Sequence, residues 1–124
     1  PADGWYEWQA RASGPKQPFF FHRPDDGVFF FAGLAATDPD GRRTMAILTT
    51  DANGIAAPVH GRMPVVLADD AAADTWIDPD APESVLRDLL APAADAETEV
   101  VPVSRAVNRP ENEGPELARP VEGE

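Results

Sequence analysis

Two side chains in the sequence are suited to proton transfer. Glu7 lies between Tyr6 and Trp8, and a carboxyl group beside aromatic side chains loses hydration, which suits proton exchange near neutral pH. On the residues alone, a solvated strand glutamate is the simpler interpretation. His60 stands before Gly61 in a segment without strand periodicity, and a glycine permits an unusual approach of the backbone. An isolated histidine is nevertheless more often a hydrogen-bonded structural residue than a catalyst.

Arginine and threonine residues elsewhere in the sequence are weaker candidates for a site. By composition alone, Arg62 is best interpreted as a residue that caps an element or pairs with one of the many carboxylates. Thr49 and Thr50 have the pattern of ordinary strand residues. Arg42 and Arg43 follow a glycine-containing turn and form a small basic cluster, for which two roles stay open: contact with DNA, or keeping an edge strand soluble.

Several kinds of chemistry are excluded by what the sequence lacks. It contains no cysteine, so these residues hold no disulfide, thiolate metal site or cysteine nucleophile. It has no phosphate loop, dinucleotide fingerprint, calcium-type carboxylate cluster or zinc spacing, and we expect no cofactor and no metal. No apolar run approaches the roughly 18 to 20 residues that span a bilayer, and the first residue is Pro1 instead of Met. We expect a soluble chain without an export signal that begins after processing or partway through a longer product.

Charge is distributed unevenly along the chain. The formal net charge is -12, which taken alone argues against a nucleic-acid partner because DNA-binding surfaces are normally basic. Residues 1–68 hold seven acidic and six basic residues, whereas residues 69–124 hold fifteen acidic and four basic residues. From position 108 onward, Pro, Glu and Gly dominate, and such a composition buries little apolar area. We therefore predict a domain over residues 1–107 and an acidic tail over residues 108–124, its last ten or so residues held by local contacts or mobile.

The elements that must position the candidate residues begin early in the chain. Nine of the ten aromatic residues fall within positions 5–31, so the core is expected to form there. Alternation and turn residues predict strands over 5–9, 17–22, 28–34, 43–50, 63–67 and 100–103. The second and third of these strands are expected to be antiparallel neighbours. Asp69 is expected to cap a helix over 70–77, and Pro82 to begin another that runs to about Leu90.

Several segments, in order, resemble one known family. They read Ala-Asp-Gly-Trp-Tyr-Glu-Trp over 2–8, Lys-Gln-Pro-Phe over 16–19, Phe-Ala-Gly-Leu over 31–34, Ile-Leu-Thr-Thr-Asp-Ala-Asn over 47–53, His-Gly-Arg-Met-Pro-Val-Val-Leu over 60–67, and a tail signature within 103–117. Together they resemble the SOS response-associated peptidase family, the abasic-site processing proteins. The resemblance implies an α+β fold with a curved, barrel-like, mainly antiparallel β-sheet and a few short helices. It covers only the C-terminal part of that domain, so the domain is expected to be incomplete.

The resemblance also implies a chemistry. In that family, an N-terminal cysteine attacks the ring-opened aldehyde of an abasic site in single-stranded DNA and forms a thiazolidine crosslink. Glu7 matches the family's active-site glutamate, which handles protons at the amine and in reversal of the crosslink. His60 matches the histidine that would protonate the sugar ring oxygen. Arg62 would contact phosphate or orient an acid, and Thr49 and Thr50 would lie beside the site.

Partners and location follow from the same resemblance. The expected partner is single-stranded DNA with abasic sites, bound by the full-length protein in the bacterial cytoplasm, at the nucleoid. A half-domain exposes strand edges and apolar faces, so association with the missing half or with a second copy is also expected. Because the cysteine is absent, we expect these residues alone to be inactive. Two alternatives stay open: a non-catalytic interaction module, and a peptidase limited to processing its own N-terminus.

Overall fold

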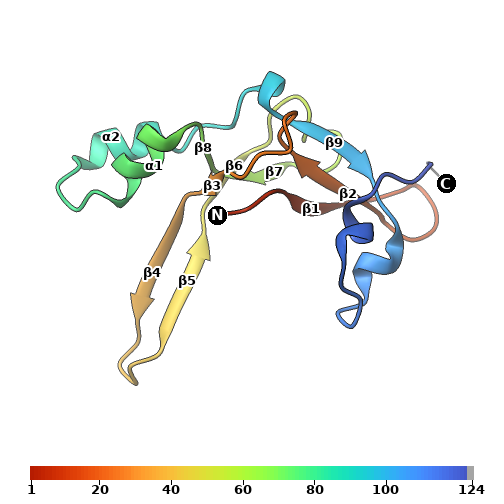
Figure 1. The fold of residues 1–124 in the computed structure, drawn as a ribbon, viewed down its shortest axis with the longest axis horizontal. Helices are drawn as coiled ribbons and strands as arrows, with labels where there is room; N and C mark the ends of the chain where they lie inside the picture. The colour runs from red at the N-terminus through yellow and green to blue at the C-terminus, as the bar shows by residue number, and fades with distance from the viewer. Residues whose placement is uncertain (123–124) are drawn as a thin grey trace.

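The computed structural model describes residues 1–122 (Figure 1). Its strands are β1 (Trp5–Gln9), β2 (Gln17–His22), β3 (Phe30–Phe31), β4 (Gly33–Thr37), β5 (Arg43–Ile47), β6 (Thr49–Asp51), β7 (Arg62–Pro64), β8 (Val66–Leu67) and β9 (Glu99–Pro102). Its α-helices are α1 (Asp70–Ile77) and α2 (Glu83–Asp88), and its 3-10 turns are η1 (Asp95–Glu97), η2 (Arg105–Asn108) and η3 (Pro115–Ala118). The α+β class is confirmed. The sheets are small and antiparallel, and within residues 1–122 they do not close into a barrel.

The candidate glutamate is carried by a three-stranded sheet in the order β1-β2-β9. β1 and β2 have the predicted bounds, and their register pairs Trp5 with Phe21 and Glu7 with Phe19. The ring of Trp5 stacks on that of Phe21 with centroids 5.0 Å apart. The expected pairing of β2 with the 28–34 segment is wrong, because β9 occupies the other edge of β2.

Three strands that were each predicted to be continuous are broken at one residue. The breaks fall at Ala32, Leu48 and Val65, which separate β3 from β4, β5 from β6, and β7 from β8. The Ala32 amide donates to the Val65 carbonyl at 2.9 Å, the Val65 amide to the Leu48 carbonyl at 2.9 Å, and the Leu48 amide to the Ala32 carbonyl at 3.0 Å. At this three-way junction each strand changes partner, giving the pairs β3-β8, β4-β5 and β6-β7. Local periodicity continues through the junction, so the sequence carries no sign of the break.

The junction belongs to one of two small hydrophobic cores. Ala32, Val65 and Leu67 are buried there against α1 and the end of α2. α1 has the predicted bounds, and the Asp69 carboxylate accepts the Ala72 amide at 2.8 Å as its N-cap. α2 begins after Pro82 but ends at Asp88, earlier than predicted. The second core gathers Phe21, Ala56 and Met63 beneath the three-stranded sheet.

The acidic C-terminal segment returns to the sheet. Val103 forms a β-bridge with Pro120, and the Val121 amide donates to the Pro102 carbonyl at 2.9 Å. Residues 120 and 121 are thus held by contacts with the end of β9, not by local contacts. Positions 123 and 124 of the predicted tail lie outside the described residues. Within residues 1–122, no helix is long and apolar enough to cross a membrane.

Gly4 immediately precedes β1 and lies against Phe20 and Phe21 of β2. A Cβ atom at this position would collide with the Phe20 ring and with the Phe21 carbonyl oxygen, a backbone atom that cannot easily move. We expect Gly4→Ala to lower the free energy of unfolding by about 1–3 kcal/mol, because overpacking forces the backbone to shift. Urea denaturation measures this loss. Gly61→Ala is the control, since a Cβ there meets nothing within 4 Å, and an equal loss in both variants would contradict the packing argument.

Candidate functional site

Glu7 and His60 meet at the surface although they come from distant parts of the chain. Glu7 projects from β1, and His60 ends the loop between β6 and β7. The Glu7 Oε2 atom lies 4.0 Å from the His60 Nδ1 atom, with the glutamate side chain 25% and the histidine side chain 48% exposed. A carboxylate and an imidazole, both accessible to a solute, therefore lie next to each other on the surface.

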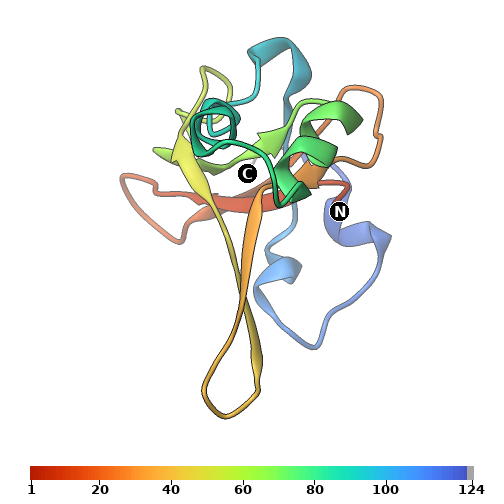
Figure 2. The same cartoon turned by 90° about the vertical axis from the view of Figure 1, so that its left-hand side faces the viewer.

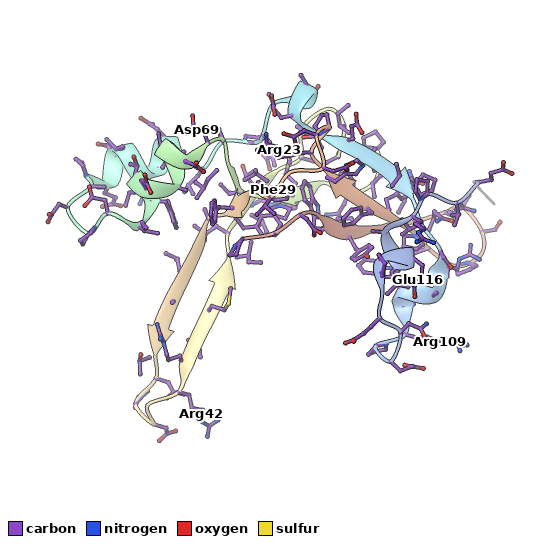
Figure 3. All side chains as sticks on the ribbon, viewed as in Figure 1. Arg23, Phe29, Arg42, Asp69, Arg109 and Glu116 are labelled. Atoms are coloured by element: carbon purple, nitrogen blue, oxygen red, sulfur yellow. The ribbon has the colours of Figure 1, made fainter. Side chains whose placement is uncertain are left out.

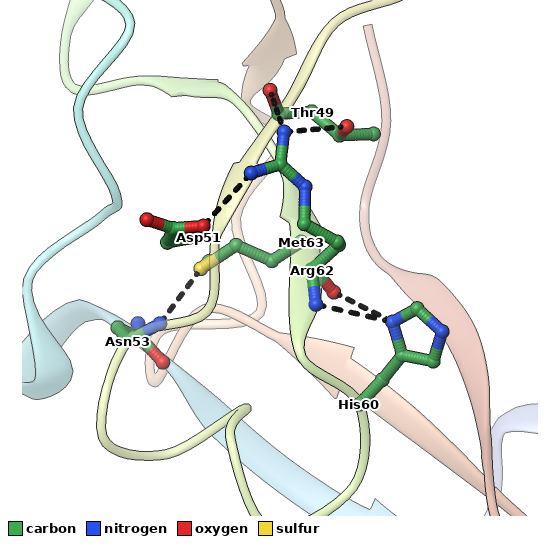
Figure 4. Close-up of polar contacts among 6 residues, drawn as sticks. All are labelled: Thr49, Asp51, Asn53, His60, Arg62 and Met63. Atoms are coloured by element: carbon green, nitrogen blue, oxygen red, sulfur yellow. Dashed lines mark hydrogen bonds and ion pairs between the residues drawn. The ribbon is translucent and has the colours of Figure 1, made fainter.

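The imidazole of His60 is held by the backbone that follows it. Its Nδ1 atom lies 3.2 Å from the Arg62 amide nitrogen, which donates to it, and 3.1 Å from the Arg62 carbonyl oxygen (Figure 4). The first contact requires an unprotonated Nδ1, and the second requires a proton on that atom. Because Arg62 offers a partner for either form, the ring keeps a hydrogen-bond partner when it gains or loses a proton at Nδ1.

Residues flanking Glu7 do not shield it as the sequence suggested. Tyr6 and Trp8 lie on the opposite face of β1, because neighbouring strand residues point to opposite sides, and their ring centroids are 6.5 Å apart. Burial raises the pKa of the Tyr6 phenol, and the charge of Asp3 raises it further, so Tyr6 is neutral at physiological pH. The β1 residues that share the Glu7 face are Trp5 and Gln9, each two positions away.

Sequence reasoning missed the residue that organises the His60 loop. Asn53 is 8% exposed, and its Oδ1 atom accepts the amides of Ile55 at 3.1 Å and Ala56 at 2.9 Å. Its Nδ2 atom donates to the Ala93 carbonyl at 2.9 Å and to Thr98 Oγ1 at 3.0 Å. The loop then closes when the His60 amide donates to the Ala56 carbonyl at 3.0 Å. An Asn before a Gly in an aperiodic segment was the available signal.

The loop that carries His60 is also attached to β1. Gln9 on β1 donates through Nε2 to the Pro58 carbonyl at 2.7 Å, so the strand that carries Glu7 also holds the loop that carries His60.

Gly61 was expected to permit an unusual backbone approach. It does not have a positive φ, and there is open space around it, so the backbone does not require a glycine there.

Arg62 has its guanidinium in a separate cluster. Its Nη1 atom donates to Asp51 Oδ1 at 2.9 Å, and its Nη2 atom donates to the Thr49 carbonyl at 2.9 Å and to Thr49 Oγ1 at 3.2 Å (Figure 4). This is the simpler of the two interpretations of the sequence, a pairing with a carboxylate. Thr50 lies opposite the buried Met63 in the β6-β7 ladder, so it shares the core face instead of the Arg62 face.

The remaining basic candidates lie far from this region of the surface. Arg42 and Arg43 are at the tip of the β4-β5 hairpin, which projects away from the three-stranded sheet (Figure 3). The Arg42 amide donates to Asp38 Oδ1 at 2.8 Å within the turn. The structure therefore brings Glu7 and His60 together, joins Arg62 to them only through its backbone, and leaves Arg42 and Arg43 apart. Within residues 1–122, no group of three His, Cys, Asp or Glu side chains is arranged to hold a metal ion.

Comparison with known proteins places the chain in a family. The sequence model described as SOS response associated peptidase (SRAP) matches residues 1–110. The chain belongs to the SRAP family. This confirms the family that the ordered segments had indicated.

Curated relatives of this SRAP chain are named abasic site processing proteins. YoqW of Bacillus subtilis is 35% identical over 122 residues, covering 94% of this chain and 54% of YoqW. YedK of Escherichia coli is 33% identical over 125 residues, covering 97% of this chain and 55% of YedK. HMCES of Gallus gallus is 32% identical and is covered over 42% of its length. The chain thus spans about half the length of the bacterial relatives that it matches.

Solved structures share the fold. An X-ray structure of a protein from Bacteroides thetaiotaomicron superposes with a TM-score of 0.83 at 21% identity, over 98% of this chain and 55% of its own. A second, from Bordetella bronchiseptica, superposes with a TM-score of 0.67 at 29% identity, over 84% of this chain and 53% of its own. The arrangement of small antiparallel sheets described above therefore occurs within longer chains.

Proposed function

We propose that this SRAP chain takes part in the processing of abasic sites in single-stranded DNA, with Glu7 and His60 as its proton-transfer residues. The observation that carries the proposal is the 4.0 Å approach of the Glu7 carboxylate to the His60 imidazole. The names of the curated relatives supply the substrate class. Action on chromosomal DNA would place the protein in the bacterial cytoplasm, at the nucleoid.

The two side chains match the proton transfers that an abasic site requires. The deoxyribose exists mainly as a cyclic hemiacetal, and protonated His60 donates to the ring oxygen as the bond between that oxygen and C1′ breaks. The C1′ hydroxyl proton is lost, and the open-chain aldehyde results. When an amine adds to the aldehyde, Glu7 takes a proton from nitrogen and returns it to the departing hydroxyl, which leaves as water. General acid and base groups of this kind accelerate such steps by about 10²–10⁴-fold.

The nucleophile must come from outside these residues. The 124 residues contain no cysteine, whereas a thiazolidine needs a thiol and an amine from one terminal cysteine. The amine forms the imine with C1′, and the thiolate then adds to the imine carbon and closes the ring. In the bacterial relatives, the region outside the match is nearly as long as the matched region. We place the cysteine in a region of that kind.

DNA is expected to approach the half of the chain with balanced charge. Residues 1–68 carry Glu7, His60 and most of the basic side chains. The Arg62 side chain is 51% exposed, so a phosphate is expected to take the donor positions of its guanidinium that Asp51 and Thr49 do not occupy. Arg42 and Arg43 would contact the DNA backbone at a second point, at the hairpin tip. A backbone contact of that kind weakens with added salt.

The proposal is tested with two forms of the protein. Residues 1–124 alone are expected to form no heat-stable adduct with an abasic single-stranded oligonucleotide, because they lack the thiol. The completed protein, in which the part of YoqW outside the matched half precedes Pro1, is expected to form one, and replacement of its terminal cysteine by Ala should abolish the adduct. Denaturing electrophoresis measures both. A stable adduct with residues 1–124 alone would contradict the proposal, because it would show that these residues hold a nucleophile. No adduct with the completed protein would also contradict it and would favour an interaction module.

A further inference from the structure

A cavity of about 240 Å³ lies between the two hydrophobic cores. Trp5, which packs against the core beneath the three-stranded sheet, forms part of its wall, and Leu67 and Leu89 of the junction core form another part. The segment between α2 and η1 also lines it, and this segment lies on the side of the molecule away from the β4-β5 hairpin (Figures 1 and 2). A mostly apolar cavity with a few polar groups is typical of small-molecule sites.

Two N–H groups of the cavity lining lack an acceptor. The Trp5 Nε1 atom and the Arg23 Nε atom are buried and have no hydrogen-bond partner within residues 1–122, and both residues line the cavity. Buried donors are paired in the great majority of cases, and an unpaired one costs free energy. A molecule that enters the cavity with a hydrogen-bond acceptor is therefore favoured over a purely apolar one.

Charged groups at the cavity decide what kind of acceptor fits. Asp88 and Glu97 are exposed residues of the lining and form its rim. The charge of Arg23 is already paired, because its Nη2 atom lies 2.9 Å from the Asp25 carboxylate. An anionic ligand would meet the two rim carboxylates without a free cation to offset them, so a neutral ligand is favoured. Carboxylates accept hydrogen bonds, so a ligand N–H fits at the rim.

We propose that this cavity binds a small, neutral cyclic amide. The carbonyl oxygen of the ligand accepts from Trp5 Nε1 and Arg23 Nε, and its ring N–H donates to a carboxylate of the rim. A free pyrimidine base belongs to this class, and the loss of a base is the reaction that creates an abasic site. The choice of a pyrimidine base as the natural ligand rests on the proposed function, whereas the cavity and its donors do not.

A base that is still joined to DNA fits the cavity less well. Much of the lining, from Ala72 to Thr98, belongs to the half of the chain in which residues 69–124 hold fifteen acidic and four basic residues. The phosphates of a DNA strand are repelled by such a surface, whereas a free base is neutral. The same repulsion disfavours orotate, a pyrimidine base that carries a carboxylate.

The test follows the indole N–H signals by NMR while uracil is added without DNA. The Trp5 signal is expected to move downfield as its N–H gains an acceptor, and Trp5→Phe identifies this signal by removing it. The Trp8 and Trp76 signals are internal controls and should stay in place. Their N–H groups already donate to Asn108 Oδ1 at 2.7 Å and to the Gly33 carbonyl at 2.9 Å. Orotate should bind about tenfold more weakly than uracil.

A variant that keeps the charge tests the second donor. Arg23→Lys removes the Nε donor but retains a cation opposite Asp25, and it should weaken uracil binding about tenfold. Arg87→Lys is the matched control, because Arg87 pairs with Glu83 on α2 and lies outside the cavity lining. This control should change the affinity by less than about twofold. Circular dichroism checks that each variant is folded.

The titration is made with residues 1–124 and repeated with the completed protein, its terminal cysteine replaced by Ala. An unmoved Trp5 signal, equal shifts of the three indole signals, or equal affinities for uracil and orotate would overturn the proposal. So would a response of residues 1–124 that is lost in the completed protein, since the added segment would then supply the acceptor. Because no DNA is present, failure here is separable from failure of the proposed activity.

Discussion

Replacing His60 with Gln, or Glu7 with Gln, in the completed protein is expected to slow formation of the abasic-site adduct about 100-fold. Glutamine retains much of the volume and polarity of each side chain but cannot exchange a proton at neutral pH. The 4.0 Å approach of the two groups further predicts that their effects are not additive, because residues that act as a unit share one loss. The double variant should therefore be little slower than either single variant.

The chain contains a matched control for this prediction. His22 and Glu99 are also a histidine and a glutamate on different strands, with Nε2 and Oε2 3.8 Å apart. His22→Gln and Glu99→Gln should leave the rate within about twofold of the parent, since this pair has no assigned chemistry. Single-turnover kinetics with an abasic oligonucleotide measures all of the rates. Equal losses in the two pairs, or no loss at Glu7 and His60, would show that the assignment of roles is wrong.

Asn53→Ala is expected to lower the free energy of unfolding by about 3 kcal/mol. The side chain makes four hydrogen bonds at an almost fully buried position. Its removal leaves the Ile55 and Ala56 amides and the Ala93 carbonyl without that partner. In the completed protein the same change should also slow adduct formation, because the loop that ends at His60 loses its anchor.

The control for Asn53 is Asn112, an asparagine whose side chain makes a single hydrogen bond. Asn112 is exposed, and its Nδ2 atom donates to the Ala106 carbonyl at 2.8 Å. Asn112→Ala should cost less than about 1 kcal/mol. Urea unfolding of residues 1–124 gives both values. A loss at Asn53 no larger than that at Asn112 would mean that the loop is held by other contacts.

Local patterns predicted what depends on neighbouring residues alone. The bounds of β1 and β2 followed from aromatic alternation, and the start of α1 followed from Asp69, whose carboxylate caps it. The three strand breaks did not follow, because the junction of Ala32, Leu48 and Val65 depends on partners that only the fold brings together. The same holds for the length of α2, which ends before the last apolar residues of its pattern.

In the candidate site too, local sequence predicted some features and others depended on the fold. Glu7 and His60 were singled out from the sequence by residue type and by a family resemblance, and no local signal placed them in contact. Asn53 was missed because its importance depends on Ala93 and Thr98, forty and more positions away. Whether Arg62 pairs locally or faces a ligand was open in the sequence, and the Asp51 carboxylate next to it in the β6-β7 ladder decides its geometry.

The most direct test of the central claim compares the two histidines of the chain during binding. The completed protein, with its terminal cysteine replaced by Ala so that no reaction occurs, is titrated with an abasic single-stranded oligonucleotide while the imidazole signals are followed by NMR. We expect the signals of His60 to shift and those of His22, which is 14% exposed and contacts Asp26, to stay unchanged. An intact oligonucleotide of the same sequence should produce a much smaller shift at His60. Unchanged His60 signals, or equal shifts with both oligonucleotides, would contradict a role of His60 at the abasic site.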